Sequence, residues 1–293
     1  MNSNLSNYFK GVSWFLLALL SSVLNDIISK KIGLEFSFTQ ISFLRSLGST
    51  LTLIPFILFS GIKTLKTKKL KIHFLRGILL FFALSTWVYG LTITSVASMT
   101  IISFSIPAIT LILANLVLNE DVKWYRWVAT ILGFIGVIIA MYPTKTVFDI
   151  RMIVLLLSAF IFSTLDIINK KFVNSESMIS MLFYSSFFST IVALPFTYHS
   201  WRSLNYIDLS LIFVLGSSAN LILYFLLKSF SLVDSSAVAP YRYIELVLAA
   251  IAGFLFFNET VSHYIWLGGV VLIFSTTFIF YTEKNNIKIC SKF

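Results

Sequence analysis

The chain has 293 residues, of which 58% are hydrophobic and only 12% are charged, and its mean hydropathy is +0.91. A soluble domain has roughly 25% charged residues, so this composition excludes a soluble protein and indicates an integral membrane protein with spans of about 20 residues. The net charge of +10 would suit nucleic acid, but the positions of the basic residues fit membrane orientation better. The single cysteine, Cys290, excludes an intrachain disulfide and a cysteine-based metal site.

Continuous apolar segments follow one another along the chain. The first begins at Gly11 without a small-residue cleavage site, so we expect a span and no cleaved leader. Each segment is predicted to be helical, because a lone segment in lipid must satisfy its own backbone groups. Unbroken apolar runs exclude a transmembrane β-barrel. The sequence therefore predicts an all-α integral membrane protein with ten transmembrane helices, at 11–31, 37–61, 73–94, 97–118, 124–142, 151–171, 178–198, 207–230, 235–257 and 262–281.

The second half of the chain repeats the first. The run Asp-Ile-Ile-Ser-Lys-Lys at 26–31 returns as Asp-Ile-Ile-Asn-Lys-Lys at 166–171, and Ile-Pro-Phe at 54–56 returns as Leu-Pro-Phe at 194–196. A duplicated apolar chain is typical of secondary transporters. Because each copy has an odd number of helices, the second copy enters the membrane from the opposite side. We therefore predict two inverted five-helix repeats, 1–142 and 150–283, followed by a cytoplasmic tail, 284–293.

The distribution of Lys and Arg predicts the orientation. With the N-terminus in the cytoplasm, 14 of the 22 Lys and Arg residues lie on the inner side and 5 on the outer side, while Arg45, Lys228 and Arg242 lie within spans. This asymmetry follows the positive-inside rule. We expect both termini to be cytoplasmic, in a bacterial inner membrane, and the basic run from Lys63 to Lys71 to lie beside the inner headgroups.

A pattern recurs at the end of each copy. Ser105-Ile106-Pro107-Ala108 is followed by Leu118-Asn119-Glu120 and by a helix with Gly133 and Gly136; Tyr243-Ile244-Glu245 is followed by Phe257-Asn258-Glu259. With Arg45 in the second helix, this pattern resembles the EamA branch of the drug/metabolite transporter superfamily over about 11–281. Leu246 stands where the second copy often has proline, and Pro240 lies earlier, so the ninth helix is expected to bend at a different level.

The resemblance implies a transporter. Within the family the chain is most similar to S-adenosylmethionine uptake transporters of intracellular bacteria, so S-adenosylmethionine is the expected small-molecule substrate, with exchange for S-adenosylhomocysteine as a further option. The bias toward Phe, Ile, Lys and Asn suits an AT-rich genome. Another polar metabolite, an amino acid or a drug, carried in either direction, remains an alternative.

Glu245 and Arg242 are predicted to lie near the middle of the ninth helix. A charged group there costs about 2.5–3.5 kcal/mol on insertion scales and is by default a functional hypothesis. Because the two residues are three apart, they can pair on one helix face. They can also engage a charged substrate: the carboxylate suits an ammonium or sulfonium cation, and the guanidinium suits a carboxylate.

Prolines mark two helices as walls of the site. Pro240 lies beside Tyr241 and Tyr243 in the ninth helix, and Pro107 lies after Ser103 and Ser105 in the fourth. A proline removes a backbone donor and frees carbonyl groups to line a cavity. Inverted-repeat transporters bind substrate between such matched, interrupted helices. We therefore place substrate contacts on these tyrosines and serines, and a gating role on both prolines.

Further candidates lie on the third and eighth helices. Trp87, Tyr89 and Tyr224 can stack on a purine or enclose a methylated cation, and ordinary packing is the alternative for each. Asn220 lies near the middle of the eighth helix. A buried amide in a bundle more often bonds a neighbouring helix than a substrate, although substrate binding remains a hypothesis for it.

The repeated acids Asp26 and Asp166 each lie about one turn from two lysines near a helix end. A local charge cluster is the favoured interpretation; alternate gating at opposite faces is the functional one. Glu120 and Glu259 end the fourth and ninth helices and are expected to stabilise the helices that follow, because a negative charge is favourable at a helix N-terminus.

A multispan membrane enzyme is a distant alternative. His73, His199 and His263 are isolated, and no H-E-x-x-H or G-x-S-x-G motif is present. We therefore expect no catalytic residue, cofactor or metal, and no nucleotide-binding loop to power transport. The small residues at Ala129, Gly133, Gly136, Gly268 and Gly269 fit internal helix packing and homodimerisation equally well.

Overall fold

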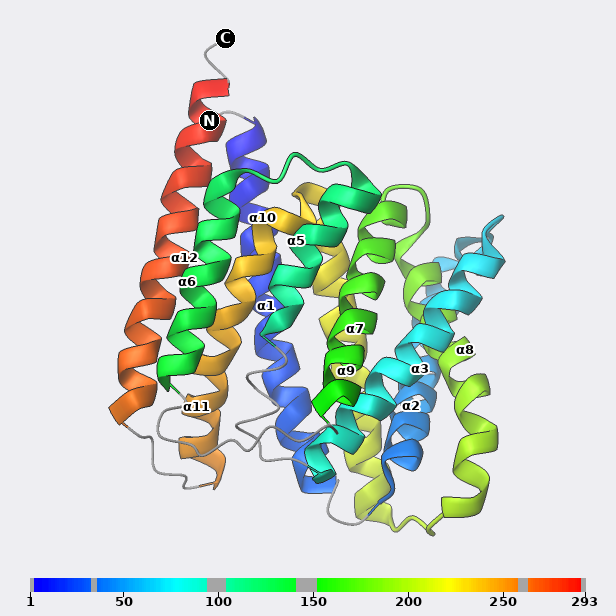
Figure 1. Cartoon of the computed structure of the whole chain (residues 1–293). Helices are drawn as coiled ribbons and strands as arrows, with labels where there is room; N and C mark the ends of the chain where they lie inside the picture. The colour runs from blue at the N-terminus through cyan, green and yellow to red at the C-terminus, as the bar shows by residue number, and fades with distance from the viewer. Residues whose placement is uncertain (1–2, 33–35, 94–103, 141–151, 258–262, 291–293) are drawn as a thin grey trace.

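A computed structural model describes residues 3–32, 36–93, 104–140, 152–257 and 263–290, and in these ranges the chain forms helices and no strand (Figure 1). The first copy contributes α1 (Ser3–Ile32), α2 (Phe38–Ser60), η1 (Ile62–Leu65), α3 (Leu70–Ile93), α5 (Ser105–Leu118) and α6 (Trp124–Ala140). The second contributes α7 (Met152–Phe172), α8 (Met178–Thr197), η2 (Tyr198–Ser200), α9 (Tyr206–Leu232), α10 (Ser235–Val238), η3 (Ala239–Tyr243), α11 (Ile244–Phe257) and α12 (His263–Cys290).

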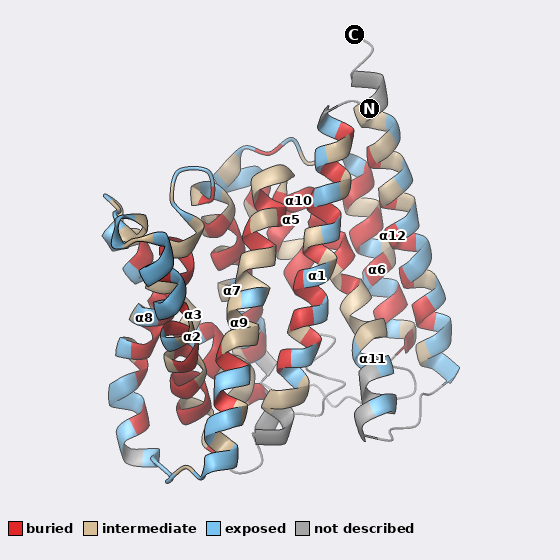
Figure 2. Cartoon of the chain, turned by 180° about the vertical axis from the view of Figure 1, so that it is seen from behind, coloured by how far each residue is buried: buried red, intermediate tan, exposed pale blue. Residues whose placement is uncertain are grey.

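Seven of the described helices, α1, α2, α3, α7, α8, α9 and α12, are long and apolar enough to cross a membrane, and α5 and α6 are shorter apolar helices. Their outer faces carry large exposed apolar side chains such as Phe59, Val270 and Phe274, while buried residues gather inside the bundle (Figure 2). An apolar exterior around a partly polar interior is the arrangement that lipid requires. The prediction of an all-helical membrane protein is confirmed at this level.

Helix packing follows the sequence repeat. Helix α1 of the first copy packs against α9 of the second copy. Helix α7, the second-copy equivalent of α1, packs against α3, the first-copy equivalent of α9. Each of the pairs α2 with α8 and α6 with α12 joins a helix to its own counterpart. Local details repeat as well: Ser37 caps α2 by accepting from the Gln40 amide, and Ser177, 140 residues later, caps α8 by accepting from the Ser180 amide. The duplication in sequence is therefore a duplication in structure.

The helices form three neighbouring groups across the bundle (Figure 1). α6 and α12 form one side, α2, α3 and α8 form the other, and α1, α5, α7 and α10 lie between them. Both termini lie at the same end of the bundle. We call this the termini end. α12 continues to Cys290 and so extends as a helix into the segment predicted to be a tail.

The predicted ninth helix is broken, as Pro240 suggested. It consists of the single turn α10, the 3₁₀ segment η3 that contains Pro240, and α11. Proline lacks the N–H that a continuous α-helix needs and clashes with the preceding turn. Pro107 does not act in the same way: it is the third residue of α5, where its missing N–H costs nothing. The expected break at Pro107 is thus a helix start, and residues 94–103 lie outside the described ranges.

Glycines let α6 approach its neighbours closely. A Cβ atom at Gly133 would collide with the ring of Tyr243, and one at Gly136 would lie 3.1 Å from the carbonyl oxygen of Gly268 on α12. These small residues therefore serve contacts within the chain, which is the first of the two readings of their sequence pattern. Gly269 is different, because a Cβ there would meet Val247 at an ordinary 3.8 Å.

Candidate functional site

Five charged residues lie on five different elements of the bundle. Asp26 comes from α1, Arg45 from α2, Asp166 from α7, Arg242 from η3 and Glu245 from the first turn of α11. We call these five residues the charge cluster.

Arg242 and Asp166 form the closest pair of the charge cluster. The guanidinium donates from Nη2 to Oδ2 of Asp166 at 2.7 Å, and the Phe15 ring lies 6.0 Å from the same guanidinium. Two expectations need correction here. Arg242 does not pair with Glu245 on its own helix, because the break at η3 directs it to α7; Asp166 is 6% exposed and pairs with Arg242, so it is not a helix-end cluster with the neighbouring lysines.

Glu245 lies in the first turn of α11, which packs against α1. Glu245 is half-buried and lies three residues after Arg242. Ser22 and Asp26 are four residues apart and therefore share one face of α1. Asp26 on α1 and Glu245 on α11 therefore belong to helices that pack against each other.

Asp26 is exposed, although it belongs to an interhelical charge cluster. Among the described residues no ion pair within 4.0 Å joins Asp26, Arg45 or Glu245 to another side chain. Asp26 lies six residues before the end of α1, and both the helix-end and the gating interpretations of it stay predictions.

Tyr241 and Tyr243 do not line an open site. Both are buried: the Tyr241 hydroxyl lies 2.9 Å from that of Tyr8 on α1, and the Tyr243 hydroxyl donates to the Phe104 carbonyl at 3.2 Å. The 3₁₀ turn points these rings into the helix contacts around η3. They hold the broken segment in place, which differs from the substrate contact expected of them.

The remaining aromatic candidates make ring contacts. Trp87 is half-buried, with its ring edge-on to Phe162 at 6.1 Å between centroids. Tyr89 lies 5.4 Å from Phe38. The ring of Tyr224 lies 6.4 Å from that of Trp14 and under the Lys228 ammonium. Packing accounts for these contacts, and a role in binding stays a prediction for all three.

The polar candidates separate into two groups. Asn220 bridges α9 to α2: its amide donates to the Ser49 carbonyl at 2.8 Å and to the Thr52 hydroxyl at 2.9 Å, and its oxygen accepts from the Ser49 hydroxyl at 2.6 Å. This matches the interhelical reading and leaves little of the amide for a ligand. Ser105 is half-buried at the start of α5. Ser103 lies outside the described part of the chain.

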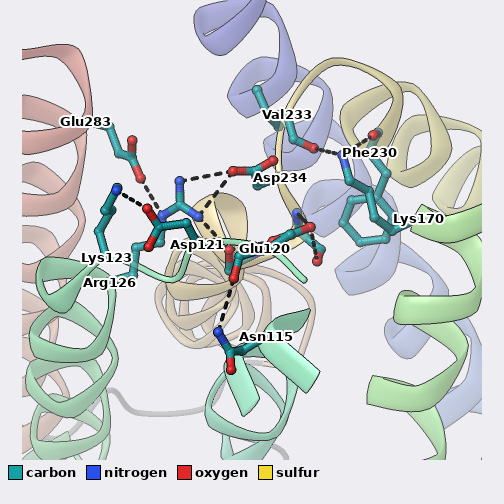
Figure 3. A network of polar contacts seen from close by, with 12 residues as sticks. Asn115, Glu120, Asp121, Lys123, Arg126, Lys170, Phe230, Val233, Asp234 and Glu283 are labelled. Atoms are coloured by element: carbon teal, nitrogen blue, oxygen red, sulfur yellow. Dashed lines mark hydrogen bonds and ion pairs between the residues drawn. The ribbon is translucent and has the colours of Figure 1, made fainter. Parts of the chain in front are cut away.

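A second polar network lies near the termini end (Figure 3). Glu120 accepts four hydrogen bonds: Oε1 from the amide and hydroxyl of Ser235, at 3.0 and 2.9 Å, and Oε2 from the amide and hydroxyl of Ser236, at 3.0 and 2.5 Å. Glu120 therefore caps the N-terminus of α10 in the other copy. We expected it to stabilise the helix that follows it in the chain, and that prediction is wrong. Its partner by sequence, Glu259, is not among the described residues.

Arg126 and Lys170 extend this termini-end network. Arg126 donates to Glu283 on α12 at 2.6 Å, to the Ser236 hydroxyl at 2.6 Å and to Asp234 at 3.3 Å. Lys170 on α7 donates to the Phe230 and Val233 carbonyls at the end of α9, at 2.8 and 2.6 Å. Charged groups thus tie α5, α6, α7, α9, α10 and α12 together at this end.

A third cluster was not predicted. Arg76 on α3 is 1% exposed and donates to the Asn169 side chain at 2.9 Å and to the Met181 carbonyl at 3.1 Å. His73 lies between Arg76 and Glu176, 3.1 and 3.3 Å from them. The signal in the sequence is weak, because Arg76 follows the basic run from Lys63 to Lys71 and resembles the cations of an inner loop. This cluster joins α3, α7 and α8 at the termini end.

Comparisons with known proteins define the class. The profile of the EamA-like transporter family matches the chain twice, over 9–142 and 150–281, so the chain belongs to this family. Its relatives include the S-adenosylmethionine uptake transporters of Rickettsia conorii, 49% identical over 97% of each chain, and of Rickettsia prowazekii, 46% identical over 98% of this chain and 97% of the relative.

More distant similarities extend along most of the chain. The riboflavin transporter of Vibrio cholerae is 25% identical over 92% of each chain. A solved structure titled "Crystal structure of protein" is 12% identical and has a TM-score of 0.76 over 93% of this chain and 96% of its own. At that identity the structural likeness shows the fold alone, and the site must be argued from the residues of this chain.

Proposed function

We propose that this chain is a secondary transporter that takes up S-adenosylmethionine by alternating access. The observation that carries the proposal is the near full-length identity of 46–49% to proteins named S-adenosylmethionine uptake transporter. The charge cluster supports it, because the substrate bears a carboxylate, an ammonium and a sulfonium, and the cluster offers both signs of charge. Riboflavin, named for relatives at 25% identity or less, would use no such set of charges.

The proposed topology is ten spans in two inverted five-helix repeats, with both termini on the cytoplasmic side of the bacterial inner membrane. The helix pairing between copies supports it, as do the common end of both termini (Figure 1) and the excess of Lys and Arg on that side. The broken segment α10–η3–α11 is the proposed ninth span. Broken helices near a pseudo-two-fold axis are where inverted-repeat transporters bind substrate.

The structure fits a state closed toward the cytoplasm. Asp166 lies six residues before the end of α7, on the side of Lys170 and the termini-end network, and its pair with Arg242 is formed. Asp26 lies six residues before the opposite end of the bundle on α1 and is exposed. We propose that these repeated acids close alternately: Asp166 with Arg242 toward the cytoplasm, and Asp26 with Arg45 toward the outside.

Energy must come from a gradient or from exchange, since the sequence has no nucleotide-binding loop. Exchange for S-adenosylhomocysteine is the form we propose, because a spent methyl donor shares the adenosine and amino acid groups of the substrate. Inward transport of one and outward transport of the other would use the same site in its two orientations.

The test is uptake of methyl-labelled S-adenosylmethionine by cells expressing the chain. Uptake above that of empty-vector cells, reduced by excess S-adenosylhomocysteine but not by methionine, is the expected result. Glu245→Gln should abolish or strongly reduce this uptake at an unchanged amount of membrane protein. If the protein is present in the membrane but no uptake occurs, the assignment of S-adenosylmethionine as the substrate is wrong. If the Glu245→Gln variant takes up the substrate normally, the assignment of Glu245 to the binding site is wrong.

A further inference from the structure

A polar network joins three helices at the termini end. Arg76 of α3 donates to the Asn169 side chain of α7 at 2.9 Å and to the Met181 carbonyl of α8 at 3.1 Å. Its guanidinium also lies 3.1 Å from Nδ1 of His73, whose Nε2 lies 3.3 Å from the Glu176 carboxylate. Because arginine can only donate, His73 accepts from it and donates to Glu176. We call this network the inner junction.

The sequence repeat identifies the equivalent place in the other copy. A Cβ atom on Gly77 of α3 would collide with the backbone of Ser189 on α8, and one on Gly216 of α9 would collide with the backbone of Ser49 on α2. Ser49 and Ser189 are 140 residues apart, as are the two repeated runs, so the two glycines are counterparts. Leu215, which precedes Gly216, is therefore the counterpart of the arginine in the inner junction.

The cluster around Leu215 is apolar. Leu215 packs with Phe36 and Ile41, and all three side chains are buried. Phe36 precedes the serine that caps α2, as Glu176 precedes the serine that caps α8, so these two residues are counterparts. We call Leu215, Phe36 and Ile41 the outer junction, because they lie at the end of the bundle opposite the termini.

The two junctions differ in chemistry although the repeat relates them. Where the inner junction has an arginine and a glutamate, the outer junction has a leucine and a phenylalanine. Ile212 and Ser29 stand where the inner junction has His73 and Asn169. Apolar contacts are non-directional, so helices can shift at the outer junction with a small change in free energy. Hydrogen bonds need a fixed geometry, and a buried charge that loses its partner is strongly unfavourable.

Alternating access moves one part of such a transporter against the other. Opening toward the cytoplasm would move α7 relative to α3 and break the bond from Arg76 to Asn169, whereas opening toward the outside acts on the apolar outer junction. Building on the proposed alternating access, but not on the proposed substrate, we infer that Arg76 is a positioning residue that keeps the substrate-free transporter open to the outside. It acts through α7, on which Asp166 pairs with Arg242 three residues before Asn169.

This resting preference favours uptake. When a ligand binds only one state of a protein, its apparent affinity falls in proportion to the fraction of molecules in that state. Because the inner junction keeps most substrate-free molecules open to the outside, external substrate meets little of this reduction. Two apolar junctions would give both sides of the membrane more nearly equal access.

The test copies the outer junction into the inner one. Replacement of a whole buried ion network by apolar residues is often neutral for stability, so we expect folded protein. Asn169→Ser alone is the second variant, because it removes only the bond between α3 and α7. The quadruple variant carries His73→Ile, Arg76→Leu, Asn169→Ser and Glu176→Phe.

Distances between spin labels report the opening at each end. In a Cys290→Ser background, cysteines replace Asn174 and Asn285, which are exposed at the termini end. In a second protein they replace Ser203 and His263, which are exposed at the opposite end. Pulsed electron paramagnetic resonance then measures both distances in nanodiscs without any substrate.

Both variants should shift the two ends in opposite directions. We expect a population with a longer distance at the termini end and a shorter distance at the opposite end. In the quadruple variant the ratio of inside-open to outside-open molecules should rise about tenfold or more, the equivalent of one hydrogen bond to a charged group. A merely structural role would lower stability without opposite shifts.

The matched control removes a buried bond that does not hold α7. Ser46→Ala with Ser189→Ala deletes the 2.9 Å hydrogen bond between α2 and α8, two helices that are each other's counterparts. Because this pair belongs equally to both copies, the control should leave the ratio of the two states near wild type. Its melting temperature shows how far lost stability alone changes the distances.

The outcomes separate this inference from the proposed substrate. Unchanged distances in both variants overturn the inference, and so does an equal shift in the control. A wild-type protein that already shows the longer distance at the termini end also overturns it. If the quadruple variant does not fold, Asn169→Ser alone decides. Opposite shifts at the two ends support the inference even if the wild type takes up no S-adenosylmethionine, which would overturn only the substrate.

Discussion

The guanidinium of Arg242 donates to the carboxylate of Asp166 at 2.7 Å and joins the 3₁₀ break η3 to α7. Phe15 of α1 covers the same guanidinium at 6.0 Å. A single pair thus fixes the broken helix against both copies. The pair lies on the side of the termini-end network, where we propose the cytoplasmic gate.

Asp166→Ala should destabilise the protein by about 1.5–3 kcal/mol, the usual worth of a hydrogen bond to a charged group, and should reduce transport. The double variant with Arg242→Ala should lose less than the sum of the two single variants, because the unpaired guanidinium is then gone. Thermal unfolding in detergent measures the cycle. Additive losses would show that the two side chains do not interact.

Glu120 should stabilise the N-terminus of α10 at the termini end. Glu120→Ala leaves the amides of Ser235 and Ser236 without their acceptor, and loss of a helix cap costs about 0.5–2 kcal/mol. We expect lower thermal stability and faster proteolysis near α10. Asp121→Asn, one residue away and exposed, is the control and should leave both readouts near wild type. If Glu120→Ala and Asp121→Asn have the same thermal stability and the same rate of proteolysis, Glu120 does not cap α10.

Gly133 should tolerate no side chain. A Cβ there would collide with the ring of Tyr243, and overpacking of this kind costs about 1–3 kcal/mol. Gly133→Ala is therefore expected to lower the unfolding temperature and to disturb η3, whereas Gly269→Ala should be neutral, because its Cβ would meet only Val247 at 3.8 Å. A stable Gly133→Ala protein would mean that Tyr243 can leave its pocket without cost.

Parts of this arrangement are predictable from sequence. The apolar runs predict the helices because lipid leaves the backbone no alternative, and the repeated run at 26–31 and 166–171 reveals the two copies. Pro240 predicts the break in the ninth segment. These features depend on local sequence or on self-similarity, and both can be read without knowledge of packing.

Contacts between distant segments are not predictable in this way. Arg242 has an acid three residues away, yet it pairs with Asp166, 76 residues away in sequence. Tyr241 and Tyr243 point into helix contacts because a 3₁₀ turn changes which face each residue occupies. Arg76 reads as a loop cation but is buried against Asn169. Each of these predictions failed because the contact partner of the side chain lies on a helix that is distant in the sequence.

The orientation of the protein in the membrane can be measured by cysteine labelling. Cys290 is the only cysteine, so Cys290→Ser gives a cysteine-free background for single cysteines in the two loops at 66–69 and 201–205. With cytoplasmic termini, a membrane-impermeant thiol reagent added to intact spheroplasts should label the second loop and not the first. The reverse pattern would invert the topology, and labelling of both or neither would contradict the predicted span order.

Transport by the purified protein tests the central claim most directly. Liposomes containing the protein and loaded with unlabelled S-adenosylmethionine are placed in labelled S-adenosylmethionine, with protein-free liposomes and Glu245→Gln liposomes alongside. We predict rapid accumulation of label only in the wild-type liposomes, and internal S-adenosylhomocysteine should also support it. Wild-type liposomes that accumulate no more label than protein-free ones would contradict the assignment of S-adenosylmethionine as the substrate.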